Sequence, residues 1–266
     1  MPNQRLPGRV SASTALLSKP RHRRRAPTNR ASTSVGPDWD ALRPRGAYAR
    51  YGREVLNATL VIAILPFVVA LAIPVALANL CAFRDPRLVL FVQPRVGYRG
   101  RVFQIYKFRT MRECAGGSHA SWTGGQDAAR VTRLGRFLRN THLDELPQMW
   151  NILKRDMDVI GPRPEMVEIE RWTEEHIDGF GRRLAIRPGI TGIAQITQGY
   201  TGHDLKAYEE KLAINASYLS SMSLRLDLEI VARTVVWMLR GKGWSWNAPR
   251  PTPAANVTSN ETSHAG

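Results

Sequence analysis

The chain has 266 residues, 43% of them hydrophobic, so it can bury the core of one sizeable domain or two small ones. Its formal net charge of +16 indicates an acidic partner, which is nucleic acid, anionic lipid or a phosphorylated substrate. The two cysteines, Cys81 and Cys114, have neither zinc-site spacing nor the pattern of a disulfide framework. This excludes a disulfide-rich secreted domain and favours a reducing compartment.

Residues 1–48 are rich in Arg, Pro, Ser and Ala, contain the basic run 21–25, and lack a sustained apolar period. This composition predicts a disordered basic arm attracted to anionic lipid. No apolar segment follows the basic run closely, so the arm is a poor secretory signal. A nucleic-acid-binding arm is the alternative interpretation.

From Val55 to Phe83 the chain has no charged residue, and as a helix this run measures about 43 Å against a hydrocarbon core of about 30 Å. A simple spanning helix is one interpretation. However, Pro66 and Pro74 interrupt the run, and arginines flank both of its ends, whereas a single span favours an asymmetric charge distribution. We therefore predict that residues 49–84 form a re-entrant helical hairpin bent near Pro66, with both ends in the cytoplasm.

The bend of such a hairpin has to be shielded, because unsatisfied backbone groups are costly in lipid. Asn57 and Asn79 stand near the two ends of the run, and we expect them to supply some of the missing hydrogen bonds.

Residues 85–242 are expected to form a cytoplasmic catalytic domain, followed by a tail over 243–266. Apolar runs at 88–93 and 102–107 predict two short strands, and most of the remainder reads as helix. Residues 224–239 alternate apolar and charged positions, which suits a helix packed on the domain or lying at a membrane interface. The predicted class is α/β, mostly helical with few short strands, with amphipathic helices at the membrane surface.

The segment 136–164 contains two adjacent carboxylates, Asp144 and Glu145, followed by Pro147. A proline is tolerated in a first helical turn, so we expect a helix with Asp144 at its N-cap and Pro147 at its third position. Its expected buried face comprises Leu146, Met149, Trp150 and Leu153. The positive end of a helix stabilises carboxylates and receives phosphate oxygens. A plain helix cap is the alternative interpretation.

Cationic side chains accompany the acidic pair, namely Lys107, Arg109, Arg136, Arg139 and Arg163. They exceed what two carboxylates need for pairing, and they suit a diphosphate whose charge must be neutralised. Mg²⁺ held by Asp144 and Glu145 fits the same chemistry. The alternative for Lys107, Arg109 and Gln195 is that they only connect loops.

Three linked segments, 91–111, 130–164 and 187–196, resemble the bacterial sugar transferase family, the monotopic polyprenyl-phosphate phosphoglycosyl transferases, and the resemblance runs from about residue 50 to 241. It implies an anchor that enters and leaves one leaflet of the bacterial inner membrane, with the catalytic domain facing the cytoplasm. It also implies a role in initiating exopolysaccharide, capsule or O-antigen assembly.

The resemblance further implies a covalent mechanism. Asp144 attacks the sugar-bearing phosphate of a UDP-sugar, releasing UMP, and undecaprenyl phosphate then takes the phosphosugar from the aspartyl ester. By the same resemblance Glu145 holds Mg²⁺ or assists proton handling. The residues assigned to the phosphates and the nucleotide are Arg139, Pro162, Arg163, Pro164 and Arg187, together with Lys107 and Arg109.

Three positions depart from the family pattern. The usual acidic residue near the start of the apolar run is missing or replaced by Asn57, Asn215 stands where an acidic residue is common, and Asp127 to Arg130 replaces the usual Asp-Pro-Arg. None of them touches the acidic pair, so activity is still expected. The transferred sugar is not determined, and loop 114–129 is the expected source of specificity.

Three other functions account for only part of the sequence. A nucleic-acid-binding module leaves the uncharged run of 55–83 unexplained, so we expect no nucleic-acid partner. A membrane scaffold leaves the carboxylates among cations unexplained. An aspartate-based phosphatase is the closest chemical alternative.

Overall fold

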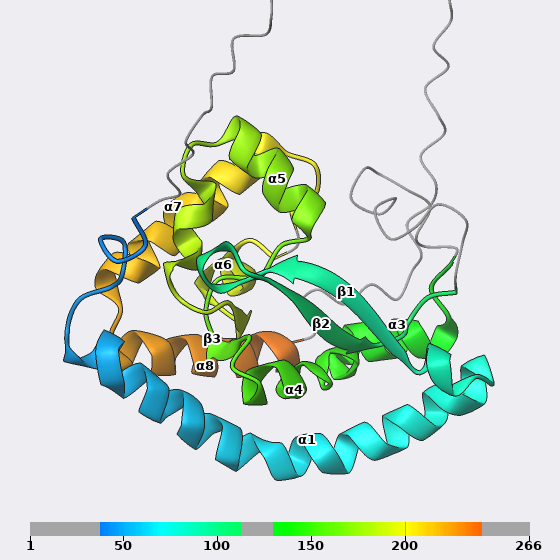
Figure 1. Cartoon of the computed structure of the whole chain (residues 1–266). Coiled ribbons are helices and arrows are strands. Elements are labelled where there is room, and N and C mark those ends of the chain that lie inside the picture. Colours follow the sequence, from blue (N-terminus) through cyan, green and yellow to red (C-terminus); the bar gives the residue numbers. More distant parts are fainter. Residues whose placement is uncertain (1–37, 113–129, 200, 241–266) are drawn as a thin grey trace, which may run out of the picture. The chain divides into compact units, whose positions relative to one another are not determined.

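The computed structural model describes residues 38–112, 130–199 and 201–240 (Figure 1). These residues belong to one unit of the chain, 37–266, and the other unit, 1–36, lies wholly outside them. Most of the predicted basic arm of 1–48, the predicted specificity loop 114–129 and the predicted tail 243–266 therefore fall outside the described residues. Those expectations remain predictions.

The described chain is mostly helical with a few short strands, which confirms the predicted composition of the fold. The main helices are α1 (Arg53–Phe83), α3 (Arg133–Thr141), α4 (Gln148–Leu153), α5 (Val167–His176), α6 (Ile193–Thr197), α7 (Leu205–Ser221) and α8 (Leu224–Leu239). The strands are β1 (Leu90–Val96), β2 (Val102–Phe108), β3 (Asp158–Ile160) and β4 (Gly189–Thr191). The predicted strands at 88–93 and 102–107 correspond to β1 and β2, and the predicted helix at 224–239 is α8.

The strands form two separate pairs. β1 and β2 make an antiparallel hairpin, whereas β3 and β4 are parallel. The β3 and β4 backbones approach very closely just beyond β3, because a Cβ atom added to Gly189 would lie 2.0 Å from the backbone nitrogen of Gly161. A side chain at position 189 would clash there, so glycine is required at this position. The close approach also places Gly161, the first residue of the segment 161–164, directly against β4.

The apolar run of 55–83 lies within one continuous helix, α1, of 31 residues. Figure 1 shows α1 as a curved helix that passes below α4 and α8. The predicted hairpin bent near Pro66 is therefore not confirmed. Pro66 and Pro74 each remove one backbone donor, and here they accompany curvature rather than a reversal of the chain.

Polar side chains attach both ends of α1 to the rest of the domain. Near its start, Asn57 Oδ1 accepts a hydrogen bond from Val159 N at 2.7 Å. Near its end, Asn79 Nδ2 donates to the carbonyl oxygens of Val89 and Arg109, at 3.1 and 3.0 Å. The expectation that these two asparagines satisfy a bend inside the membrane was wrong, because Asn57 binds the backbone of β3 and Asn79 binds backbone oxygens of the residues next to β1 and β2.

The helix α1 combines a packed stripe with a large exposed apolar surface. Val61 packs in the central core with Ile160 and Ile230, and Val75 packs in a second cluster with Leu138. The exposed apolar residues of α1 include Val55, Ile62, Phe67, Val69, Leu71, Ile73 and Leu77. Within the described ranges, one helical stretch, Tyr48–Phe83, is long and apolar enough to cross a membrane.

Candidate active site

The acidic pair stands on a separate turn between α3 and α4. His142, with φ of 57°, ends α3 in the left-handed conformation, and a 3₁₀ turn follows over Leu143–Glu145. Glu145 N donates to His142 O at 3.1 Å. The predicted placing of Asp144 at an N-cap was wrong: α4 begins only after Pro147, which occupies its N-cap. The backbone donors of the 3₁₀ turn are satisfied locally, since Glu145 N donates to His142 O and Leu146 N donates to Leu143 O.

The predicted buried face of this helix was half right. Met149 is buried and Leu146 is partly buried against the core, whereas Trp150 is 58% exposed and Leu153 is 47% exposed. The short α4 instead turns Gln148, Asn151 and Ile152 inward. Two large apolar side chains are therefore exposed a few residues from the acidic pair.

Cations from two distant segments meet at Glu145. Lys107 Nζ, on β2, lies 2.5 Å from Glu145 Oε1, and Arg163 Nη2 lies 3.3 Å from the same oxygen. The side chains of Lys107 and Glu145 are only 16% and 15% exposed. Three of the predicted site residues, separated by 38 and 18 positions in the sequence, thus form one cluster.

The pKa values of the two neighbouring carboxylates are shifted in opposite directions. Burial raises the pKa of Asp144 to about 6, even though Lys107, Arg139 and Arg163 act to lower it. Burial acts in the same direction on Glu145, but there Lys107 and Arg163 outweigh it and hold its pKa well below the usual range. At neutral pH Glu145 is a fixed anion, and Asp144 is an ionised carboxylate that its surroundings stabilise poorly.

Arg139 is held at the edge of this cluster by the residues that follow β2. Its Nε donates to Thr110 Oγ1 at 2.9 Å, and its Nη2 lies 2.8 Å from Met111 Sδ. The close packing depends on Gly135, since a Cβ there would lie 2.0 Å from Thr110 O. Arg139 is near enough to lower the pKa of Asp144, which agrees with its predicted place beside the acidic pair.

The segment 162–164 is anchored by its backbone. Gly189 N donates to Pro162 O at 3.0 Å, and Arg95 Nη1 donates to Pro164 O at 3.2 Å. Both prolines are buried, and Arg163 between them is less buried and points to Glu145. This arrangement presents one guanidinium from a firmly held loop.

Two predicted site residues make their contacts elsewhere. Arg187 Nη1 lies 2.7 Å from Glu54 Oε1 and 3.4 Å from Asp158 Oδ1, at the start of α1. Arg109 donates to Leu90 O at 3.5 Å and accepts the hydrogen bond from Asn79. Gln195 Nε2 donates to Ile190 O at 3.1 Å, in line with a loop-connecting role.

Sequence reasoning missed several residues around the site. Thr110, which holds Arg139, lies inside the segment 91–111, but nothing in its pattern distinguishes it. Asp158 lies inside 136–164, but no spacing or motif distinguishes it. Arg53 looks in the sequence like one of the arginines that flank the apolar run, although it is buried and paired with Asp158 at 3.0 Å.

The acidic pair suits a metal that arrives with a phosphate substrate. Among the described residues no group of three or more His, Cys, Asp or Glu side chains is arranged to hold a metal ion. Mg²⁺ is commonly bound by one or two carboxylates together with substrate phosphates, rather than by a closed protein cage. Asp144 and Glu145, adjacent and ionised at neutral pH, fit that kind of site.

Similarity to known proteins covers most of the described chain, including the acidic pair. A family model described as bacterial sugar transferase matches residues 48–241. A UDP-N-acetylgalactosamine-undecaprenyl-phosphate N-acetylgalactosaminephosphotransferase from Aeromonas hydrophila is 37% identical over 202 residues, covering 75% of this chain and 46% of the relative. A UDP-glucose:undecaprenyl-phosphate glucose-1-phosphate transferase from Caulobacter vibrioides is 36% identical over 204 residues, covering 74% of this chain and 75% of the relative.

A galactosyl transferase from Streptococcus agalactiae is 36% identical over 171 residues, which make up 60% of this chain and 36% of the relative. The match with the Aeromonas and Streptococcus relatives is thus confined to less than half of their length.

Proposed function

Because the chain belongs to the bacterial sugar transferase family, we propose that it transfers a sugar 1-phosphate from a UDP-sugar to undecaprenyl phosphate, releasing UMP. The observation that carries this proposal is the turn bearing Asp144 and Glu145, with Lys107 and Arg163 paired to Glu145. A pair of carboxylates alone would repel a diphosphate. The converging cations make the site suitable for one.

In the first step an Asp144 carboxylate oxygen forms a bond to the phosphorus that carries the sugar, and the bond from that phosphorus to UMP breaks. UMP leaves with the bonding electron pair. The raised pKa of Asp144 supports this role, since a poorly stabilised carboxylate is more reactive and is still mostly ionised at neutral pH. Arg139 and Arg163 neutralise the donor phosphates, with Lys107 holding Glu145 beside them.

In the second step an oxygen of undecaprenyl phosphate attacks the same phosphorus. The bond between phosphorus and Asp144 breaks, the carboxylate is regenerated, and a polyprenyl diphosphate sugar is formed. Splitting the transfer in this way replaces one difficult displacement by two easier ones. Mg²⁺, held by Asp144 and Glu145 with the donor phosphates, would neutralise charge on the transferred group. Arg187, Arg109, Pro162 and Pro164 remain predicted contributors to nucleotide binding.

The attachments of α1 support a membrane association from one side. At the start of α1, Arg53 pairs with Asp158 of β3 and Asn57 accepts a hydrogen bond from Val159 of β3. At its end, Asn79 donates to the backbone oxygens of Val89 and Arg109. A straight span would carry its two ends to opposite sides of the bilayer, away from a single domain. We infer that the curved helix α1 is embedded in the membrane from one side, with both of its ends on the cytoplasmic face of the inner membrane, where the domain lies.

Two helices that α1 passes in Figure 1 also carry exposed apolar side chains. They lie on α4 and α8, and comprise Trp150, Leu153, Leu228, Val235, Val236 and Leu239. Interfacial helices characteristically carry such residues, and anionic head groups would attract the basic chain. A site on the turn before α4 would then open close to the head groups, where the phosphate of the lipid carrier lies.

The printed names of the relatives include N-acetylgalactosamine, glucose and galactosyl transfer, so the transferred sugar has to be measured. The product would initiate synthesis of an exopolysaccharide, capsule or O-antigen.

We would incubate the full chain in lipid nanodiscs with Mg²⁺, undecaprenyl phosphate and a panel of UDP-sugars. Release of UMP and transfer of labelled sugar phosphate into the lipid fraction are the expected results, and both should be lost in Asp144→Asn.

Two outcomes would contradict the proposal. Release of free sugar phosphate without any labelled lipid would indicate the phosphatase reaction. No Asp144-dependent release from any UDP-sugar, by folded and membrane-bound protein, would indicate a scaffold.

A further inference from the structure

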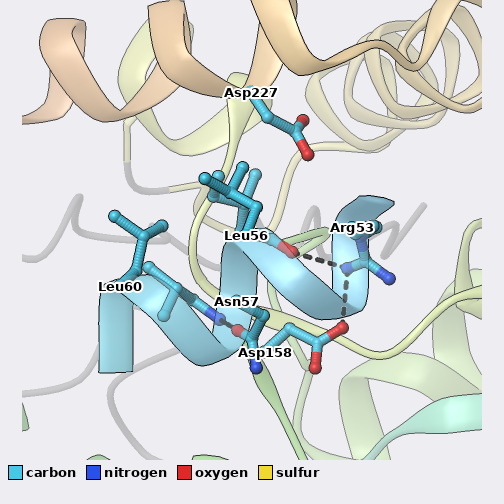
Figure 2. A pocket seen from close by; sticks show the side chains of 8 residues that line it. Arg53, Leu56, Asn57, Leu60, Asp158 and Asp227 are labelled. Carbon is cyan, nitrogen blue, oxygen red and sulfur yellow. Dashed lines mark hydrogen bonds and ion pairs between the residues drawn. The ribbon is translucent and has the colours of Figure 1, made fainter. Parts of the chain in front are cut away.

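The first residue of the membrane helix α1 is a buried arginine. Arg53 is 9% exposed, and its Nη2 lies 3.0 Å from Asp158 Oδ2 and 2.6 Å from Ile160 O (Figure 2). Arginine at the end of a membrane helix ordinarily extends toward water or head groups. Here it turns inward, to the first and last residues of β3. Burying a charge is costly unless it is paired, and the cost is tolerated where the pair fixes a geometry.

A second side chain of α1 binds the same strand one helical turn later. Asn57 Oδ1 accepts the hydrogen bond of Val159 N at 2.7 Å, and Figure 2 shows Arg53 and Asn57 together beside Asp158. On its other edge β3 is paired with β4, through Asp158 opposite Gly189 and Ile160 opposite Thr191. The position of this three-residue strand is therefore determined by α1 on one side and by β4 on the other.

The strand leads directly to the candidate active site. Ile160 is followed by Gly161, Pro162 and Arg163, and Arg163 Nη2 reaches Glu145 at 3.3 Å. Three residues span at most about 10 Å, and the proline between the strand and Arg163 restricts the backbone further. A shift of β3 would thus be passed on to the guanidinium of Arg163.

We propose that Arg53 and Asn57 are positioning residues, through which the membrane helix α1 sets β3 and so places Arg163 opposite Glu145. This rests on the proposed function, in which Arg163 binds the phosphates of the donor. It adds that correct seating of α1 is a condition for binding the donor, and not only for reaching the lipid acceptor.

The test uses two mild variants and a matched control in nanodiscs. Arg53→Lys keeps the charge, but its side chain is one atom shorter and should reach Asp158 and Ile160 O less well, and Asn57→Ala removes the acceptor for Val159 N. The control is Arg155→Gln, which breaks the exposed pair between Arg155 and Glu54 of α1 at 2.8 Å. Flotation with the vesicle fraction first establishes that each variant is membrane-bound.

The first readout is hydrogen exchange of residues 158–166, which does not require turnover. We expect about tenfold faster exchange in Arg53→Lys and Asn57→Ala, and parent-like exchange in the control. If both variants keep parent-like exchange, the link from α1 to β3 is refuted. This result holds whether or not the parent transfers any sugar, so it is distinct from a failure of the proposed function.

The second readout is a double-mutant cycle with Arg163→Gln. We expect Arg53→Lys to raise the KM for the UDP-sugar about tenfold with the acceptor KM unchanged, and to have little further effect in the Arg163→Gln background. Additive effects, or equal losses for donor and acceptor, would mean that Arg53 only stabilises the fold, and would overturn the proposal. If Arg53→Lys does not fold, Asn57→Ala is carried through the same cycle.

Discussion

Lys107 Nζ lies 2.5 Å from Glu145 Oε1, and this contact makes the electrostatic environment of Glu145 different from that of the adjacent Asp144. Glu145 receives the strongest stabilisation from the cations and remains an anion. Asp144 is left with a pKa raised to about 6 by burial. Neighbouring acids whose pKa values are driven apart commonly have different roles in a reaction. Several measurable consequences follow from this asymmetry.

The covalent step should lose its rate as Asp144 is protonated. With a pKa of about 6, the rate of single-turnover UMP release should be halved near pH 6, and at pH 5 it should fall to roughly a tenth. The assay omits the lipid acceptor, because a phosphate monoester also titrates near pH 6. A rate that stays flat down to pH 4.5 would show that Asp144 is not the titrating nucleophile.

The same asymmetry predicts that Asp144 costs stability. Its folded pKa lies above its unfolded value, so the folded state disfavours the ionised form, and the cost is present above about pH 6 and disappears below about pH 4. A difference of about two pKa units corresponds to about 3 kcal/mol. Asp144→Asn should therefore raise the Tm of the detergent-solubilised protein at pH 7.5 while abolishing UMP release. An equal Tm for parent and variant at pH 7.5 would contradict this.

Gly135 should be essential for the placing of Arg139. In Gly135→Ala the added Cβ would meet Thr110 O at 2.0 Å, so α3 has to move away from the residue that holds Arg139. We expect a loss of about 1–3 kcal/mol in stability and at least a tenfold lower kcat/KM. The matched control is Gly202→Ala, where no atom lies within 4 Å of the added Cβ, and whose stability should change by less than about 0.5 kcal/mol.

The sequence predicted elements and charges better than it predicted where side chains point. The two strands of the hairpin and α8 were placed to within a few residues, because their apolar periods are clear. The geometry of the acidic pair was missed, because the left-handed conformation of His142 has no signature in the sequence. Nothing in the local pattern indicated that Arg53 would pair with Asp158, more than a hundred residues away.

The errors on α4 have a different cause. Trp150 and Leu153 were expected to be buried because large apolar side chains usually avoid water. That rule assumes water as the only solvent, and it does not apply to a surface in contact with lipid, as we propose for the exposed residues of α1 and its neighbours.

Charge placed on the exposed surface of α1 should weaken membrane binding. Phe67 is 72% exposed near the middle of α1, and an aspartate near the centre of a membrane helix costs about 3 kcal/mol. We expect Phe67→Asp to move into the soluble fraction in a flotation assay with anionic vesicles. Leu205→Asp changes an exposed leucine at the start of α7 and should float like the parent. If the two variants float equally, the surface of α1 does not bind lipid.

The buried pair behind the segment 162–164 should show the cost of an unmatched charge. Lys211 Nζ lies 2.9 Å from Glu165 Oε1, and both side chains are less than a tenth exposed. Lys211→Met leaves the carboxylate buried without its partner and should destabilise the protein by about 3–5 kcal/mol. Adding Glu165→Gln should recover most of that loss, since the pair is then replaced by neutral groups.

The pH dependence of this pair has a defined sign. Although burial raises the pKa of Glu165, Lys211 and Arg183 outweigh it and the pKa lies below its usual value. The pair therefore contributes stability at neutral pH that is lost as the pH falls below about 4. The Tm difference between the parent and the double variant should narrow over that range. A single Lys211→Met variant as stable as the double variant would show that Glu165 finds another cation, for which Arg183 is a candidate because it also lowers the pKa of Glu165.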